Sequence, residues 1–175
     1  MYILAQIIGA IGLIIITIGM QCREKKNIIL AQAITNSCIT IQYFLLGATT
    51  GAILFIINTT RSLTFYLWDQ KGKKPNIYLL LLFTSIAIIT GIYSYKNIFS
   101  LLAIISSVVT TYGVWQKSAT KLRIIMLFCN IILVIHDIYF KAYTGMLTYI
   151  MVVISTTISL IKVDILKIDN KKLIK

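Results

Sequence analysis

The chain has 175 residues and a formal net charge of +12; 58% of its residues are hydrophobic and only 13% are charged. Soluble domains are roughly 45–50% apolar, and so few charged residues cannot provide the polar surface that a soluble fold needs. The composition therefore excludes a soluble globular domain and predicts a single integral membrane domain over residues 1–175.

Seven apolar runs follow one another along the chain, each close to the roughly 20 residues that a helix needs to cross the hydrocarbon layer. The predicted spans are Tyr2–Met20, Ile28–Leu46, Thr50–Trp68, Ile77–Tyr93, Ile98–Trp115, Leu122–Tyr139 and Tyr143–Ile161. The one proline, Pro75, lies between the third and fourth runs, so no span is expected to carry a proline kink. The pattern predicts an all-α, multi-pass membrane protein with seven transmembrane helices.

The connections between these spans are alternately basic and nearly uncharged. The first, third and fifth connections and the tail together carry fourteen lysines and arginines, whereas the second, fourth and sixth carry two. Because cytoplasmic loops keep their basic residues during insertion, we expect the amino terminus outside and the basic tail, residues 162–175, in the cytoplasm. A nucleic-acid-binding domain would gather its positive charge in one stripe, so no nucleic-acid partner is expected.

The chain resembles itself at an offset of 94 residues, without a gap. Identical residues that align at this offset include Gly19 with Gly113, Thr17 with Thr111, and Asn36 with Asn130. The offset predicts two three-helix repeats, residues 1–68 and 98–161, joined by a linker helix at residues 77–93. Both copies would begin on the same side, as in parallel repeats of transporters that bind near the midplane. A duplicated bundle that only packs well is the other interpretation.

Polar side chains inside spans are costly in lipid and usually face the interior of a bundle. Arg61 lies near the middle of the third span, and helical side chains lean toward the amino end of their helix, here the outside. Asn58 lies one turn earlier on the same face. We favour a cavity-facing Arg61 over an arginine that snorkels to the cytoplasm. A guanidinium would suit an anionic or carbonyl-bearing solute.

Three further polar residues are candidates for a solute path. Asn36 and Asn130 occupy the middles of spans two and six, where they could bind a polar solute or simply hydrogen-bond neighbouring helices. Histidine titrates near neutrality, so His136, next to Asp137, is a candidate for proton coupling, with a structural hydrogen bond as the alternative.

No enzymatic chemistry is predicted. The three cysteines form no CxxC pair and the chain has a single histidine, so neither a metal site nor a cofactor is expected. No nucleophile–base arrangement typical of a catalytic site is visible.

Two segments, Gln42–Leu63 and Leu122–Thr148, resemble the YgjV family of bacterial inner-membrane proteins. The resemblance is carried by FLLG at Phe44–Gly47, Asn58 with Arg61, VIHD at Val134–Asp137, and Gly145. It implies a multi-pass protein of the bacterial inner, or plasma, membrane, and it implies location and fold more than activity.

The plan of three, one and three helices is similar to that of the SWEET, SemiSWEET and PQ-loop transporters. Those families have a proline–glutamine kink in the first helix of each bundle and asparagines along the substrate path. Here spans one and five lack proline, and the repeat partner of Asn58 is Val152. These departures argue against rocking about prolines and against a symmetric sugar site.

The expected function is a SWEET-like transporter or facilitator of a small polar solute, with Arg61, Asn58, Asn36 and Asn130 along its path and His136 nearby. The alternative is a non-transporting scaffold or accessory subunit, in which those residues only pack and hydrogen-bond helices. The expected partners are the lipid bilayer and the solute, and formation of a homo-oligomer stays open.

Overall fold

The computed structural model describes residues 2–47, 49–72, 76–93, 95, 98–141 and 143–166. Lys73, Lys74, Pro75, Lys96 and residues 167–175, which enter the predictions on kinks and loop charge, lie outside the described residues. The helices are α1 (Tyr2–Met20), α2 (Lys25–Leu45), α3 (Thr49–Gln70), α4 (Ile77–Tyr93), α5 (Ser100–Trp115), α6 (Ala119–Tyr139) and α7 (Tyr143–Ser159), and α7 continues into a π-helical turn, η1 (Leu160–Ile165).

The prediction of an all-α chain is confirmed over the described residues, which contain seven α-helices and no strand. Each predicted span coincides with one helix to within three residues at its amino end. Long apolar runs form helices here because a helix satisfies every backbone hydrogen bond within the segment itself, which lipid requires.

Four stretches of the described chain are long and apolar enough to cross a membrane: Tyr2–Met20, Lys25–Leu45, Ala119–Tyr139 and Gly145–Asp164. Helices α4 and α5 are apolar but shorter. Helix α3 has 22 residues, but the run from Asn58 to Ser62 makes its centre polar. Large apolar side chains cover the outside of the bundle, as with Ile18 at 63% exposed and Phe128 at 61%. The count of seven crossings stays a prediction.

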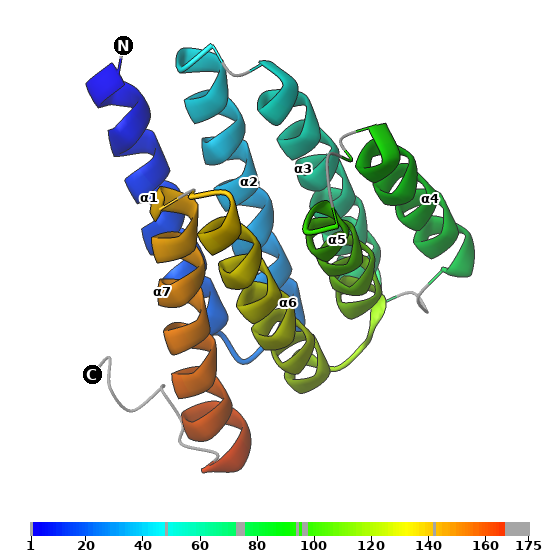
Figure 1. Cartoon of the computed structure of the whole chain (residues 1–175). Helices are drawn as coiled ribbons and strands as arrows, with labels where there is room; N and C mark the ends of the chain where they lie inside the picture. Colours follow the sequence, from blue (N-terminus) through cyan, green and yellow to red (C-terminus); the bar gives the residue numbers. More distant parts are fainter. Residues whose placement is uncertain are drawn as a thin grey trace.

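The helices form two facing rows with one helix beside them (Figure 1). One row contains α1, α2 and α3 in order, and the other contains α7, α6 and α5. Across the rows α1 contacts α7, α2 contacts α6, and α3 contacts α5, while α4 packs against α5. Consecutive helices run in opposite directions, so the chain reverses at every connection (Figure 1).

The two ends of the bundle differ in charge and in packing. The connections at residues 21–24, 71–72 and 116–118 lie at one end, which we call the basic end because they carry Arg23, Lys71 and Lys117 (Figure 1). The main hydrophobic core lies in the half nearest this end and comprises Ile16, Met20, Ile28, Ile29, Phe65, Phe83, Val114, Leu122, Met126 and Val152. The bundle is therefore most tightly closed toward the basic end.

Contacts recur in the structure at the 94-residue offset noted in the sequence. Thr35 Oγ1 donates to the Gly12 carbonyl oxygen at 3.0 Å, and at the equivalent positions Ser106 Oγ donates to the Cys129 carbonyl oxygen at 3.3 Å. Gly19 packs against Ala31, and the equivalent Gly113 packs against Ile125. Met126 lies 94 residues after Gln32, and the two side chains meet where α2 faces α6, with Gln32 Nε2 3.9 Å from the sulfur of Met126.

The turns that follow α2 and α6 place equivalent residues in the left-handed backbone region, Gly47 with φ +75° and Lys141 with φ +56°. Because a Cβ is crowded there, we expect Gly47→Ala to lower stability and Lys141→Gly to raise it, each by about 1 kcal/mol. No atom lies within 4 Å of a Cβ built on Gly47, so backbone strain alone is tested. Thermal unfolding in detergent measures both variants, and a Gly47→Ala protein as stable as the parent would contradict the expectation.

Candidate functional site

A cavity of about 410 Å³ lies between α3, α4, α5, α6 and α7. Its polar lining residues are Asn58, Arg61, Thr90, Ser100, Ser107, His136 and Tyr149, and its aromatic lining includes Phe55, Phe83 and Phe140. Ser100 begins α5 and Phe140 follows the end of α6, so the cavity reaches the end of the bundle opposite the basic end. Its size is within the range of small-molecule binding sites.

Arg61 is the charged group of this cavity, and its side chain is almost fully buried, with 5% of the residue exposed. Its Nη1 donates to Thr111 Oγ1 on α5 at 3.0 Å, and its buried Nε has no hydrogen-bond partner. None of the described residues that line the cavity is an aspartate or glutamate. The cavity is therefore lined by a buried cation, and the Nε–H of that cation has no hydrogen-bond partner.

Asn58 and His136, two other residues that the sequence singled out, also line this cavity. Asn58 lies one helical turn before Arg61 on α3, so both reach the cavity from the same face. The Nδ1 of His136 lies 2.8 Å from Oδ1 of Asp137, and its ring packs on Phe140 with centroids 4.7 Å apart. The Asp137 carboxylate in turn lies directly against Gly145, where a Cβ would have no room. His136 is thus held in place at the wall of the cavity.

Asn36 and Asn130 lie apart from this group and do not line the cavity. They are buried on α2 and α6, with 8% and 6% exposed. Nδ2 of Asn130 donates to the Met126 carbonyl oxygen at 2.6 Å, within its own helix. The structure brings Arg61, Asn58 and His136 together and leaves the two asparagines near the contact of the two rows.

The position equivalent to the cavity, between α7 and α1, is filled. Ser155, 94 residues after Arg61, donates from Oγ to the Thr17 carbonyl oxygen at 2.8 Å. Gln21 Nε2 donates to the Ser155 carbonyl oxygen at 2.9 Å. The Gln42 side chain occupies the space beside Gly9, within 2.5 Å of where a Cβ would lie. Over the described residues, positions equivalent to the cavity lining thus make direct contacts on the other side of the bundle.

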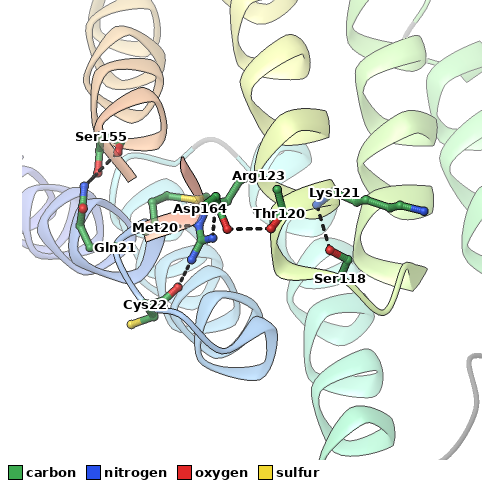
Figure 2. A network of polar contacts seen from close by, with 9 residues as sticks. All are labelled: Met20, Gln21, Cys22, Ser118, Thr120, Lys121, Arg123, Ser155 and Asp164. Carbon is green, nitrogen blue, oxygen red and sulfur yellow. Dashed lines mark hydrogen bonds and ion pairs between the residues drawn. The ribbon is translucent and has the colours of Figure 1, made fainter. Parts of the chain in front are cut away.

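A second buried arginine closes the basic end (Figure 2). Arg123 is completely buried, and its Nη1 lies 2.7 Å from Oδ2 of Asp164 in η1. Its Nε donates to the Met20 carbonyl oxygen at 3.2 Å and its Nη2 donates to the Cys22 carbonyl oxygen. Thr120 Oγ1 donates to the other oxygen of Asp164 at 2.6 Å. This Arg123 network fastens α1, α6 and η1 together.

This network was not predicted from the sequence, where Arg123, at the start of the sixth predicted span, entered only the count of basic residues in the fifth connection. A usable signal was present, because Arg123 lies between apolar residues in the first turns of α6 and Asp164 is one of only five acidic residues in the chain. Burial raises the pKa of the nearby Cys22 thiol above its usual range, although the Arg123 guanidinium opposes this shift. The thiol is therefore neutral at pH 7, and the backbone of Cys22 makes the contact with Arg123.

Lys25 and Asp69 form a second ion pair at the basic end, with Nζ and Oδ1 3.2 Å apart. It joins the start of α2 to the end of α3, and Lys25 is buried to 8% exposure. No group of three or more His, Cys, Asp and Glu side chains that could hold a metal ion occurs in the part of the chain that the structure describes.

The model of a family described as a bacterial inner membrane protein, Imp-YgjV, matches residues 3–167, which is nearly the whole chain. No curated protein and no solved structure matches the chain.

Proposed function

Because the chain belongs to the Imp-YgjV family of bacterial inner membrane proteins, we propose that it carries a small polar solute across that membrane by way of the Arg61 cavity. The observation that carries this proposal is the partnerless Nε of a buried arginine in a cavity of about 410 Å³. A buried charge is costly unless it is paired, so its presence in an otherwise mainly apolar bundle calls for a partner. A scaffold that only packs helices would need neither the cavity nor the charge.

The proposed architecture is a pair of parallel three-helix repeats with α4 as the linker. The contacts that recur at the 94-residue offset support it, because the same positions touch in both halves. The contact of Gln32 with Met126 also supports it, since a residue meets its own equivalent only near a two-fold axis. Transporters with repeats of this kind bind solute between the copies.

The proposed topology has the amino terminus outside and the basic end in the cytoplasm. The gathering of Arg23, Lys71 and Lys117 at one end supports it through the positive-inside rule (Figure 1). The cavity then faces the outside, while the core and the Arg123 network close the cytoplasmic side. A solute would enter from outside and leave after the basic end opens.

The topology predicts which engineered cysteines react on intact cells. In a background without native cysteines, we expect Leu46→Cys to be labelled by a membrane-impermeant maleimide and Lys71→Cys to be labelled only after lysis. Both side chains are exposed, Leu46 at the end of α2 and Lys71 just after the end of α3, so labelling depends on which side of the membrane each end faces. Labelling of Lys71→Cys on intact cells would contradict the proposed orientation.

The transport proposal is tested by uptake into proteoliposomes from a broad panel of labelled polar solutes. We expect at least one solute to enter faster than in protein-free vesicles, and we expect Arg61→Ala to lower its initial rate at least tenfold. Lys121→Ala, which removes an exposed charge away from the cavity, is the matched control and should leave the rate unchanged. Absence of uptake across the whole panel would overturn the proposal.

A further inference from the structure

We propose that the Arg61 cavity selects a small organic monoanion with an apolar body, a carboxylate of the size and shape of benzoate. The proposal rests on the proposed transport function, because it names the class of solute that the same cavity would carry.

The two buried arginines of the chain differ in how their charge is balanced. Arg123 has an aspartate and two backbone carbonyl oxygens around its guanidinium. Arg61 is nearly as buried, but its Nη1 meets a neutral hydroxyl and its Nε meets nothing. No acidic side chain among the described residues forms an ion pair with it. Since buried charges are normally paired, the missing anion belongs to the ligand.

The geometry of a guanidinium favours a carboxylate as this anion. Its N–H groups form a planar fork that matches the two oxygens of a carboxylate, and charge-assisted hydrogen bonds of this kind are the strongest in proteins. Thr111 Oγ1 accepts from Nη1 of Arg61 at 3.0 Å, which holds the guanidinium in place, and the Nε–H has no partner. Asn58, one turn away, brings an amide to the same part of the cavity.

The balance of charge restricts the ligand to a single negative charge. Arg61 is the only lysine or arginine among the described lining residues. His136 also lines the cavity, but the Asp137 carboxylate at 2.8 Å offsets any positive charge on its ring. A second negative charge on the ligand would therefore lose its hydration on entering the cavity without meeting a second positive charge, which is unfavourable.

The aromatic part of the cavity wall favours an apolar body for the rest of the ligand. The rings of Phe55, Phe83 and Phe140 face it, and they are held by packing. Phe55 stacks on Tyr43 with centroids 5.4 Å apart, Phe83 packs on Phe65 at 5.8 Å, and Phe140 packs on His136. Flat side chains of this kind favour offset stacking or edge contacts with an aromatic ring. A fully hydrated sugar or a zwitterion would leave polar groups unpaired among these rings.

The departure from the repeat limits binding to one ligand per chain. On the equivalent side Ser155 replaces the arginine and bonds directly to α1, and Gln42 fills the space beside Gly9. Their equivalents at the cavity are Arg61, His136 and Ala103, all of which line it. The difference between the halves therefore changes one side from a packed contact into a binding site.

The test is equilibrium binding of radiolabelled benzoate to the full chain in lipid nanodiscs. We expect saturable binding of one benzoate per chain. Hexanoate should compete within about tenfold of benzoate, whereas benzyl alcohol, benzylamine and phthalate should compete at least tenfold more weakly. Arg61→Met should weaken binding at least tenfold and Arg61→Lys by less, because lysine keeps the charge but not the fork. Lys121→Met should bind as the parent does. Thermal unfolding of each variant shows that it is folded.

Absence of saturable benzoate and hexanoate binding by the folded protein would overturn the proposal, as would equal competition by benzyl alcohol. Displacement by palmitate at concentrations far below benzoate would also overturn it, because the anion would then come from the bilayer. If carboxylates bind but no solute is taken up by proteoliposomes, the transport function fails and this assignment stands. If uptake is found only for neutral solutes, transport stands and this assignment fails.

Discussion

Arg123→Met is expected to lower the free energy of unfolding by about 3–5 kcal/mol, the usual cost of removing one partner of a buried ion pair. The substitution keeps the length of the apolar stem but leaves the Asp164 carboxylate without its cation, with that side chain only 14% exposed. It also removes the donors to the carbonyl oxygens of Met20 and Cys22. Thermal or denaturant unfolding in detergent, followed by circular dichroism, measures the change.

A double-variant cycle separates the ion pair from simple packing. Asp164→Leu alone should also destabilise, because Arg123 then stays buried with backbone partners only. The double variant Arg123→Met with Asp164→Leu should lose less free energy of unfolding than the two single variants lose together, because no unpaired charge remains. Strictly additive losses would show that the two side chains do not interact as the structure describes.

Ala103→Phe is expected to reduce solute uptake at least tenfold while leaving the protein folded. Ala103 lies in the wall of the Arg61 cavity on α5, so a benzyl group there would occupy space that the proposed solute needs. It removes no hydrogen bond and no charge, which separates the effect of blocking the cavity from the effect of altering Arg61. The initial rate of uptake into proteoliposomes, with the solute identified by the panel, measures the loss.

Ile105→Phe provides the matched control, because Ile105 is two residues away on the same helix and 48% exposed on its outer face. This variant should transport at the parental rate. Unchanged uptake by Ala103→Phe, in protein shown to be folded by its unfolding temperature, would mean that the solute does not pass through this cavity.

The helices were predictable because the physical requirement that produces them is local. An apolar run such as Tyr2–Met20 or Ile77–Tyr93 must satisfy its backbone hydrogen bonds within itself, and both bounds agree with the structure. The face of α3 that carries Asn58 and Arg61 was also predictable, since residues three apart share a helical face. A charged side chain within an apolar span is energetically costly, so the sequence alone identified Arg61 as a candidate site residue.

The Arg123 network and the one-sided cavity could not be predicted in the same way, because both depend on how distant segments meet. Arg123 and Asp164 are 41 residues apart, and nothing in either local sequence specifies that they pair. The symmetry of Asn36 and Asn130 suggested a central path, yet the cavity lies where the halves differ. The sequence repeat indicates contacts that both halves share. The cavity instead depends on Arg61, whose equivalent 94 residues later is the different residue Ser155.

The position of α4 has a consequence for any attempt to rearrange this chain. A unit of three helices ends on the side opposite to its start, so a second unit joined directly to the first would run upside down. The single helix α4 supplies the extra reversal that lets α5 begin on the same side as α1 (Figure 1). If the proposed seven-span topology holds, deleting residues 71–97 is expected to invert the helices that follow and to move the basic residues after α5 to the opposite face of the membrane. Expressing the two triplets as separate chains would avoid that inversion, because each would then be inserted according to its own loop charges.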